Sequence, residues 1–428
     1  MNKDKLLIIA DDLTGALDTG VQFAKNKIEV RVYLSPPVPE SNDENILVDV
    51  INTDSRHLTP DKAALAVKSV VEGQKKYTYF YKKTDSCLRG NIGAELEALM
   101  QATGSQCLPF VPAYPQMKRF TRKGFQYLAE QLIHESSMAD DPLNPISESY
   151  IPAIIGKQSA VHVQLIPLND NIPALEQTPG ILVFDSETKK DMVKIAAFLR
   201  EKRMLKTSAG CAGFAEALME VLPLEKNANR SEKPIKRLPV LVVSGSLHPV
   251  SINQVNAAVK NRIPGIYFDV NEALQPDWQD SQKAKSIITV CSRELADKGI
   301  CVLGTNGAFG INSETAIKQD RMFQTESGTK GKINCRIPNA IGKLVKGITE
   351  KTGALHLVIF GGDTLLGISR ELGYKCIKPV REIRPGIVLA KIPDSKDGNI
   401  LVTKAGAFGE ENLIFIIREF LLKGNSDA

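Results

Sequence analysis

The sequence is poor in the residues that build disulfide frameworks, metal centres and membrane spans. Its 428 residues include seven cysteines and five histidines. Because the cysteine count is odd and no C-x-x-C pair occurs, neither a disulfide scaffold nor a zinc ribbon is expected. The histidines do not gather at metal-ligand spacing. No apolar run reaches the ~18 residues of a membrane span, and Asp11-Asp12 comes too early for a signal peptide. We therefore expect a cytoplasmic protein with reduced thiols and no membrane partner.

Aromatic residues and concentrated positive charge are also scarce. The chain has one tryptophan and a formal net charge of +5, and its lysines and arginines are dispersed. Nucleic-acid binders usually gather basic residues on one stripe with aromatic residues among them. We expect no nucleic-acid partner, and we interpret the local positive charge as serving a small anionic ligand.

Two familiar nucleotide signatures are missing. The sequence contains neither a Walker A motif nor a G-x-G-x-x-G fingerprint. Residues Gly328–Lys332 superficially resemble a phosphate-binding loop, but they lack its spacing and the Ser or Thr after the lysine. We expect an exposed basic loop there.

Short apolar runs alternate with helical patterns along the whole chain, which indicates an α/β fold with largely parallel sheets. The expected elements of the first half are Leu6–Ala10, Ala16–Lys27, Val30–Leu34, Ile46–Ile51, Pro60–Val71 and Tyr77–Tyr81. Those of the second half are Val240–Val243, Val302–Leu303, Leu355–Phe360, Leu365–Leu372 and Asn412–Leu422.

The chain is too long for one hydrophobic core, which usually stops growing near ~250–300 residues. A polar, charged stretch from Pro223 to Pro239 separates two well-patterned regions. We therefore predict two α/β domains flanked by helices, residues 1–225 and 240–428, joined by a linker at 226–239. The active site is expected in the cleft between them.

Polar clusters follow three expected strands of the first domain. They are Asp11-Asp12, Asp54-Ser55-Arg56 and Lys83-Thr84-Asp85-Ser86. Ligands of parallel sheets bind beyond the carboxyl ends of the strands, so the shared placement predicts one site.

The residue types in these clusters suit an acidic substrate and proton transfer. Adjacent carboxylates such as Asp11 and Asp12 are costly unless a cation or a shared proton compensates them. One of them can take a proton from an attacking hydroxyl, and the alternative is that one caps the following helix. Arg56 is a candidate carboxylate clamp. Function is also expected for Lys83, Asp85 and Arg89, whereas Lys82 is expected to be solvated.

In the second domain, Gly361-Gly362-Asp363-Thr364 follows an expected strand and precedes a helical stretch. Glycines let the backbone approach a phosphate, and the helix N-terminus offers it free N–H groups. Ser244-Gly245-Ser246 has the same placement after another strand. The alternative is a plain turn in which Asp363 or Thr364 caps the helix.

Taken in order, these clusters resemble the four-carbon acid sugar kinase family over nearly the whole chain. The matching segments are Ile9–Ala16, Thr53–Arg56, Tyr81–Ser86, Arg89–Glu95, Asp141–Pro145, Ser244–Ser246, Phe360–Thr364 and Lys404–Gly409. The resemblance implies an N-terminal substrate domain and a C-terminal nucleotide domain. It implies transfer of the γ-phosphoryl group of ATP, with Mg²⁺, to the O4 hydroxyl of a tetronate, D-threonate first and D-erythronate or a 3-oxo-tetronate after it.

The resemblance also implies roles for individual residues. Asp12 and Asp85 are the expected catalytic residues. The expected substrate-binding residues are Asp11, Arg56, Lys83, Thr84, Asp85 and Arg89. The expected ATP-binding residues are Ser244, Ser246, Gly361, Gly362, Asp363, Thr364 and Gly406. No metal ligand is singled out, and the expected partners are the small-molecule sugar acid and, in a homodimer, a second copy of the chain.

Two other functions fit a two-domain α/β chain. An NAD-dependent dehydrogenase of hydroxy acids would need the dinucleotide fingerprint that the sequence lacks. A non-catalytic binding protein for sugar acids would normally carry an export signal. Both are kept as alternatives to the kinase.

Overall fold

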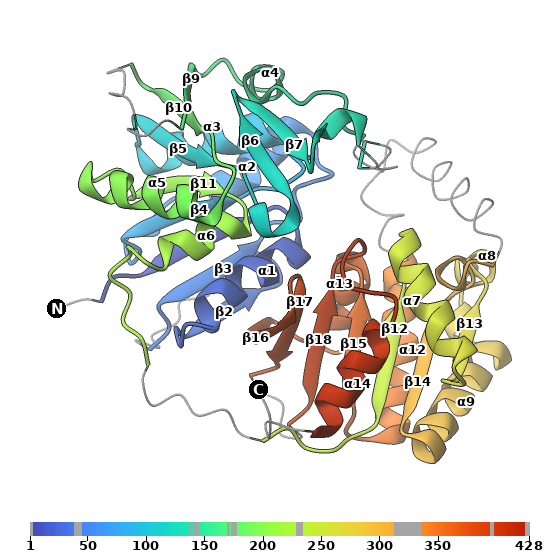
Figure 1. The fold of residues 1–428 in the computed structure, drawn as a ribbon. Helices are drawn as coiled ribbons and strands as arrows, with labels where there is room; N and C mark the ends of the chain where they lie inside the picture. The colour runs from blue at the N-terminus through green and yellow to red at the C-terminus, as the bar shows by residue number, and fades with distance from the viewer. Residues whose placement is uncertain are drawn as a thin grey trace. The chain divides into compact units, whose positions relative to one another are not determined.

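The computed structural model describes residues 3–37, 45–136, 138–139, 145–168, 172, 178–227, 234–311, 336–393 and 398–423. The chain divides into two compact units, residues 1–228 and 229–428, coloured blue to green and yellow to red in Figure 1. Each is described by itself. The segments 141–144 and 328–332 singled out above lie outside the described residues.

A parallel sheet forms the centre of the first unit. Its strands lie in the order β2 (Val30–Tyr33), β3 (Val48–Asn52), β1 (Leu6–Ala10), β4 (Tyr79–Lys83), β11 (Thr207–Gly210), β5 (Cys107–Val111), β10 (Gly180–Phe184) and β9 (Val163–Ile166). The described pairings between these strands are all parallel. Ala10 lies opposite Asn52 on one side and Lys83 on the other. The segments that follow these three residues therefore leave the sheet at the same edge.

Helices and a small antiparallel sheet complete the first unit. The helices are α1 (Leu13–Ala24), α2 (Pro60–Val71), α3 (Ile92–Thr103), α4 (Ile151–Gly156), α5 (Lys189–Glu201) and α6 (Ala212–Leu218). The small sheet contains β6 (Arg119–Arg122), β7 (Phe125–Leu128) and β8 (Gln131–Leu132). Local sequence sets the helix starts: Thr188 and Asp191 form a capping box at α5, and Pro60 opens α2.

The second unit has its own sheet, which is parallel except at one side. Its strands lie in the order β13 (Gly265–Phe268), β14 (Ile300–Thr305), β12 (Val240–Ser244), β15 (His356–Phe360), β18 (Ile400–Lys404), β17 (Ile387–Lys391) and β16 (Cys376–Arg384). Strand β17 runs antiparallel to both of its neighbours. The helices are α7 (Pro249–Lys260), α8 (Val270–Ala273), α9 (Gln282–Lys298), α12 (Arg336–Thr352), α13 (Gly362–Glu371) and α14 (Leu413–Lys423).

The register between neighbouring strands determines which loops lie together at the edge of this sheet. Phe360 lies opposite Ser244 and also opposite Lys404. The segments beginning at Gly245, Gly361 and Ala405 therefore leave the sheet side by side. The predicted α/β class with largely parallel sheets is confirmed.

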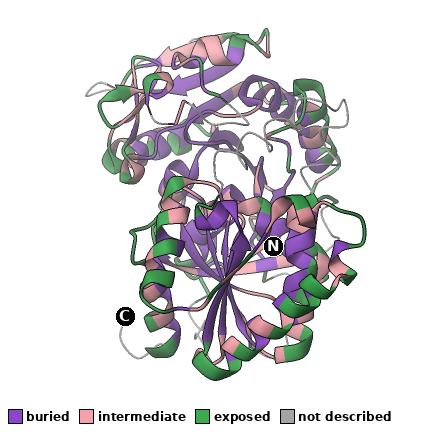
Figure 2. Cartoon of the chain, turned by 90° about the vertical axis from the view of Figure 1, so that its right-hand side faces the viewer, coloured by how far each residue is buried: buried purple, intermediate pink, exposed green. Residues whose placement is uncertain are grey.

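The core of each unit lies between its sheet and the flanking helices. Figure 2 shows the strands of the second unit buried and the helices beside them exposed mainly on their outward faces. Strands β1 and β15 have every residue buried, which fits their continuous apolar sequences. Hydrophobic burial of this kind, rather than the polar clusters, holds the sheets together.

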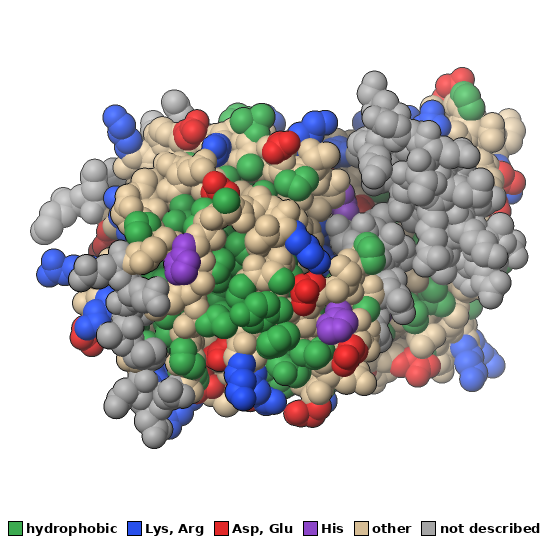
Figure 3. All heavy atoms as spheres, turned by 90° about the horizontal axis from the view of Figure 1, so that it is seen from above, with side chains coloured by type: hydrophobic (Ala, Val, Ile, Leu, Met, Phe, Trp, Pro, Cys, Tyr) green, Lys and Arg blue, Asp and Glu red, His purple; other side chains and the backbone are tan. Residues whose placement is uncertain are grey.

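The described surface and cysteines are unremarkable for a globular protein. Lys and Arg side chains are spread over the face shown in Figure 3 and form no large patch on it. The cysteines within the described residues are all free thiols. In the same part of the chain, no helix combines the length and apolar character needed to cross a membrane.

Candidate active site

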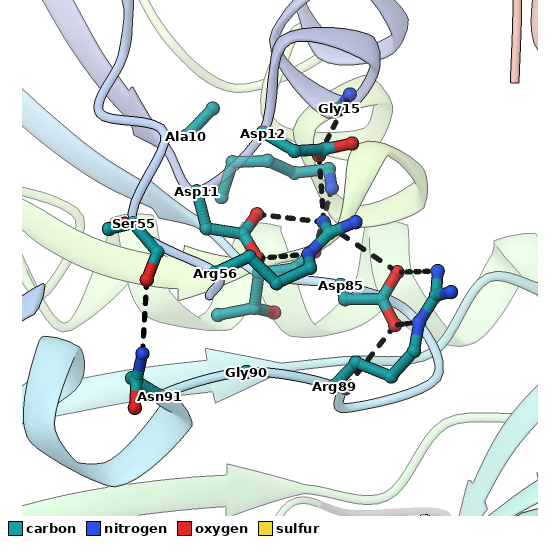
Figure 4. Close-up of polar contacts among 12 residues, drawn as sticks. Ala10, Asp11, Asp12, Gly15, Ser55, Arg56, Asp85, Arg89, Gly90 and Asn91 are labelled. Carbon is teal, nitrogen blue, oxygen red and sulfur yellow. Dashed lines mark hydrogen bonds and ion pairs between the residues drawn. The ribbon is translucent and has the colours of Figure 1, made fainter. Parts of the chain in front are cut away.

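Arg56 holds the two adjacent carboxylates that follow β1. Its Nε and Nη2 donate to Asp11 Oδ2 and Oδ1 at 2.7 and 3.0 Å, and Nη2 also donates to Asp12 Oδ1 at 2.7 Å (Figure 4). The repulsion between neighbouring carboxylates is thus compensated by one guanidinium, in the bidentate geometry that arginine favours.

Asp12 also begins helix α1. Its side chain accepts from the Gly15 N–H at 3.0 Å and from the Thr14 hydroxyl. The capping alternative for Asp12 is therefore confirmed, and it moves the start of the helix to Leu13 from the expected Ala16. A side chain at position 15 would come within 2.9 Å of Lys83 Nζ, so glycine lets the lysine approach this turn.

Asp85 and Arg89 form a second ion pair beside the first. Arg89 donates to both carboxylate oxygens of Asp85, at 2.8 and 3.0 Å, and the Cys87 N–H adds a bond at 3.2 Å. Arg56 Nη2 lies 3.9 Å from Asp85 Oδ1 and links the two pairs. Five of the predicted residues therefore form one continuous network at the sheet edge: Asp11, Asp12, Arg56, Asp85 and Arg89.

Charge compensation controls ionisation in this network. Burial raises the pKa of Asp85, but Arg89 and Arg56 outweigh it and bring that pKa well below its usual range. Burial also raises the pKa of Asp11, but the positive charges of Arg56, Lys82 and Lys83 lower it more, so this pKa lies below its usual value. Both groups are therefore carboxylates near neutral pH.

Exposure separates the three carboxylates. The side chains of Asp11 and Asp85 are 2% and 10% exposed, whereas that of Asp12 is 22% exposed. Asp12 is thus the carboxylate of this network with the best access to a ligand.

Lys83 and Thr84, the other two residues predicted at this edge, make no hydrogen bond to the five-residue network in the described structure. Lys83 Nζ donates to the Thr84 carbonyl at 2.7 Å and lies by the first turn of α1. The Thr84 hydroxyl faces the neighbouring strand, where it donates to the Gly210 carbonyl at 3.3 Å, and the residue is fully buried.

The expectation of a solvated Lys82 is wrong. Lys82 is fully buried, and its Nζ lies 3.1 Å from Glu95 Oε2. Neighbouring residues of a strand point to opposite faces, so Lys82 and Lys83 serve different sides of β4. Glu95 also accepts from Ser55, and burial raises its pKa despite the opposing effect of Lys82. The one sequence feature that could have indicated this pair is the position of Glu95 among the apolar residues of α3, which suggests a buried carboxylate in need of a cation.

In the second unit, the three predicted segments lie against one another. A side chain at Gly245 would collide with Thr364 Oγ1, and one at Gly406 would meet Ser246 Oγ at 3.0 Å. Gly361 has a φ of 106°, which favours glycine, and the space beside it is bounded by Thr364 and Ser246. The structure therefore brings these residues to one edge of the sheet.

Helix α13 begins at this point without a side-chain cap. The alternative in which Asp363 or Thr364 caps the helix is wrong. The first N–H groups of a helix have no intrahelical acceptor, and in the described part of the chain nothing else accepts from those of Gly362, Asp363 and Thr364. The buried Ser244 hydroxyl also finds no partner among the described residues. Such a turn is suited to an anion.

Lys404 is a residue of this edge whose role the sequence did not indicate. It is almost fully buried, and its Nζ donates to Ser251 Oγ at 2.7 Å and to the Gly406 carbonyl at 2.9 Å. Ser251 itself donates to the same carbonyl at 3.0 Å. These bonds fix Gly406 against α7. No carboxylate among the described residues pairs with this lysine, and burial lowers its pKa to about 7.

The stability of the second unit should therefore rise with pH through Lys404. Between pH 7 and the ordinary lysine value of 10.5, the unfolded chain binds more protons than the folded one, so raising the pH favours folding. Below pH 7 both states are protonated and this gain is absent. The contribution between pH 7 and 10 is up to roughly 3 kcal/mol.

Urea unfolding monitored by the single tryptophan, Trp278, which lies in this unit, measures the effect. Lys404→Met should flatten the rise, whereas Lys298→Met, at an exposed lysine of α9, should keep it. Equal pH slopes in wild type and Lys404→Met would show that Lys404 does not titrate in this range.

The described residues contain no group of three or more His, Cys, Asp or Glu that could hold a metal ion by themselves. Mg²⁺ needs no such group when it travels with a nucleotide, because phosphate oxygens and water supply most of its ligands. The exposed Asp363 offers a carboxylate beside the α13 turn. The residues present therefore fit a magnesium–nucleotide complex.

Comparison with known proteins assigns each unit a description. Residues 6–218 match the sugar-binding N-terminal domain, and residues 241–414 match the nucleotide-binding C-terminal domain. The chain is 29% identical to the D-threonate kinase of Salmonella typhimurium, with 96% of each chain covered. It is 26% identical to the D-erythronate kinase of Heliobacterium modesticaldum, with 97% of each covered. It is 24% identical to the 3-oxo-tetronate kinase of Pectobacterium atrosepticum, over 95% of this chain and 97% of the relative.

Two solved structures share the fold. One is a Salmonella typhimurium LT2 protein described as a tRNA synthase, with a TM-score of 0.75 at 21% identity over 97% of this chain and 99% of that one. The other is a Haemophilus influenzae protein, with a TM-score of 0.70 at 20% identity over 97% and 100%. At these identities the likeness concerns the fold alone.

Proposed function

This chain belongs to the four-carbon acid sugar kinase family and is a sugar-acid kinase, and from that premise we propose that it transfers the γ-phosphoryl group of ATP to the O4 hydroxyl of D-threonate. Relatives named for threonate, erythronate and 3-oxo-tetronate all match nearly the whole chain, and the threonate kinase has the highest identity of the three compared here. Because an enzyme of this kind draws on ATP, the proposal includes a cytoplasmic location.

The ion network of the first unit is the observation that carries the proposal. Phosphoryl transfer depends on positioning and charge stabilisation, with a carboxylate to orient the attacking hydroxyl and accept its proton. Asp12 suits this role because it is the most exposed carboxylate of the network and Arg56 and the Gly15 amide hold it in place. Asp11, by contrast, is buried and neutralises Arg56.

The remaining residues of this edge are proposed to bind the sugar acid. Asp85 accepts hydrogen bonds from hydroxyl groups of the substrate, and Arg89 fixes the orientation of this carboxylate. Because Asp85 lies beside Arg56, it is the second catalytic candidate. Lys83 brings an ammonium group to the first turn of α1. Thr84 contributes by positioning Lys83, because its carbonyl accepts from Lys83 Nζ while its hydroxyl and N–H donate to the Gly210 carbonyl.

The second unit is proposed to bind the phosphates of ATP. The uncapped amides of Gly362, Asp363 and Thr364 face an anion, and the glycine at position 361 lets it approach. The other proposed contacts are the hydroxyls of Ser244 and Ser246 and the backbone of Gly406. Asp363 would hold Mg²⁺, which neutralises phosphate charge when bound. That the substrate site of the first unit and the phosphate site of the second unit come together during phosphoryl transfer stays a prediction.

A screen of ADP release tests the proposal. The wild-type protein should release ADP in the presence of Mg-ATP with D-threonate, and kcat/KM should be lower for D-erythronate, the L-isomers and the 3-oxo forms. Absence of ADP with every tetronate would overturn the proposal. Reduction of NAD by the same acids would favour a dehydrogenase. Thermal stabilisation by the acid but not by Mg-ATP would favour a binding protein.

A further inference from the structure

Arg119, the first residue of β6, is a buried cation that has no counter-ion among the described residues. The residue is 7% exposed, and its Nη1 donates to Ser86 Oγ at 2.9 Å. Its buried Nε finds no acceptor among the described residues, and none of them offers it a carboxylate. Arginine does not lose its proton in proteins, so this charge cannot be removed by deprotonation. A buried charge without an ionic partner is costly, which raises the question of what neutralises it.

The small antiparallel sheet holds Arg119 against the segment that carries Asp85. Gln126 on the neighbouring strand β7 is fully buried and donates to the Ser86 carbonyl at 2.9 Å. Ser86, which accepts from Arg119, directly follows Asp85 in the chain, and Asp85 in turn accepts from Arg89. Arg119 therefore belongs to the same edge of the first unit as the ion network.

The charges at this edge cancel once Lys83 is counted with the network. The network itself has three carboxylates, Asp11, Asp12 and Asp85, and two guanidinium groups, Arg56 and Arg89. Lys83 supplies the third cation, because its Nζ lies with Asp12 at the first turn of α1. Three negative and three positive groups leave no formal charge. Lys82 is paired with Glu95 and adds nothing. Among the described residues Arg119 thus contributes one positive charge that no carboxylate compensates, and one carboxylate of an incoming ligand would balance it.

We propose that Arg119 binds the carboxylate of the sugar acid, with the Ser86 hydroxyl beside it. The inference rests on the proposed function and extends it, because it locates the group that distinguishes an acid from a neutral polyol. Arg56 already donates to Asp11 and Asp12. In this proposal it holds those two aspartates in place and does not bind the carboxylate of the substrate. A guanidinium matches a carboxylate in shape as well as charge, which suits it to this selection.

The test compares an acid with its neutral counterpart in wild type and variants. The acid is the tetronate that the wild type phosphorylates fastest, and the counterpart is the polyol in which a hydroxymethyl group replaces the carboxylate, measured as a competitive inhibitor. In Arg119→Met, KM for the acid should rise roughly 10- to 100-fold, as expected for loss of a charged hydrogen bond. The inhibition constant of the polyol and KM for ATP should change less than about threefold, and Arg119→Lys should recover part of the loss.

Arg122→Met is the matched control, because Arg122 lies on the same strand, pairs with Glu187 at 2.6 Å and is 43% exposed. It should leave both constants unchanged. An unchanged KM for the acid in Arg119→Met, or a parallel loss of acid and polyol binding, would overturn the inference and assign Arg119 a packing role.

A crystal structure of the wild type with the acid decides the point without any variant. A carboxylate oxygen within about 3.2 Å of the Arg119 guanidinium supports the inference, and a carboxylate bound elsewhere overturns it. Failure of the proposed function has a different signature, because the wild type itself would then release no ADP with any tetronate.

Discussion

Asp12→Asn should lower kcat by roughly 10³-fold while KM for ATP changes little. A positioned general base typically contributes 10²–10⁴-fold, and an amide cannot accept the proton of the attacking hydroxyl. The side chain keeps its size, so the network around Arg56 loses one ion pair but no volume. Steady-state kinetics with the preferred tetronate measure the effect.

The choice of asparagine separates catalysis from helix capping. Asparagine caps helices about as well as aspartate, so α1 should remain intact in the variant. If Asp12 only capped α1, the substitution would leave kcat unchanged. Asp61→Asn, in the exposed first turn of α2, is the control for a lost surface carboxylate and should behave as wild type.

Glu95→Gln should destabilise the first unit by about 3–5 kcal/mol. The substitution leaves the Lys82 ammonium buried with neutral partners only, and breaking a buried ion pair on one side typically costs this much. Urea unfolding followed by circular dichroism measures it. Trp278 fluorescence, which reports the second unit, should keep its midpoint.

Removing the second charge should restore most of this loss. In the double variant Lys82→Met with Glu95→Gln no charge is left buried, and the glutamine can still accept from Ser55. Because burial raises the pKa of Glu95, the difference between wild type and Glu95→Gln should shrink in acid, where the wild-type carboxyl is also neutral. A double variant as unstable as the single one would refute the ion-pair explanation.

The placement of the sites could be predicted from the sequence because it depends on the sheet alone. Continuous apolar strands mark β1, β12 and β15, and parallel neighbours end at the same edge. Asp11, Arg56 and Asp85 therefore had to meet at one edge, and Ser246, Gly361 and Gly406 at another. Helix α2 was predicted with its observed bounds because Pro60 fixes its start.

What could not be predicted depends on contacts between distant segments. The partner of Lys82 is Glu95, and only the fold shows that the pair is buried. The expected strand Tyr77–Tyr81 is displaced to Tyr79–Lys83, because pairing with β1 and β11 extends it through both lysines. Lys404 opens a segment that resembles the family, but neither this lysine nor Arg119 was predicted as a buried cation, because their own sequence neighbours do not show burial. That no described carboxylate pairs with either of them becomes visible only from their surroundings in the fold.

The alternation of Lys82 and Lys83 along β4 restricts how this region can vary. Inserting or deleting one residue in the strand would exchange the faces of the two ammonium groups, leaving Glu95 without its cation and placing the wrong lysine at the sheet edge. We expect length changes here to disturb folding together with the substrate binding proposed for Lys83. Related chains should therefore preserve the length of this strand and tolerate variation mainly by substitution.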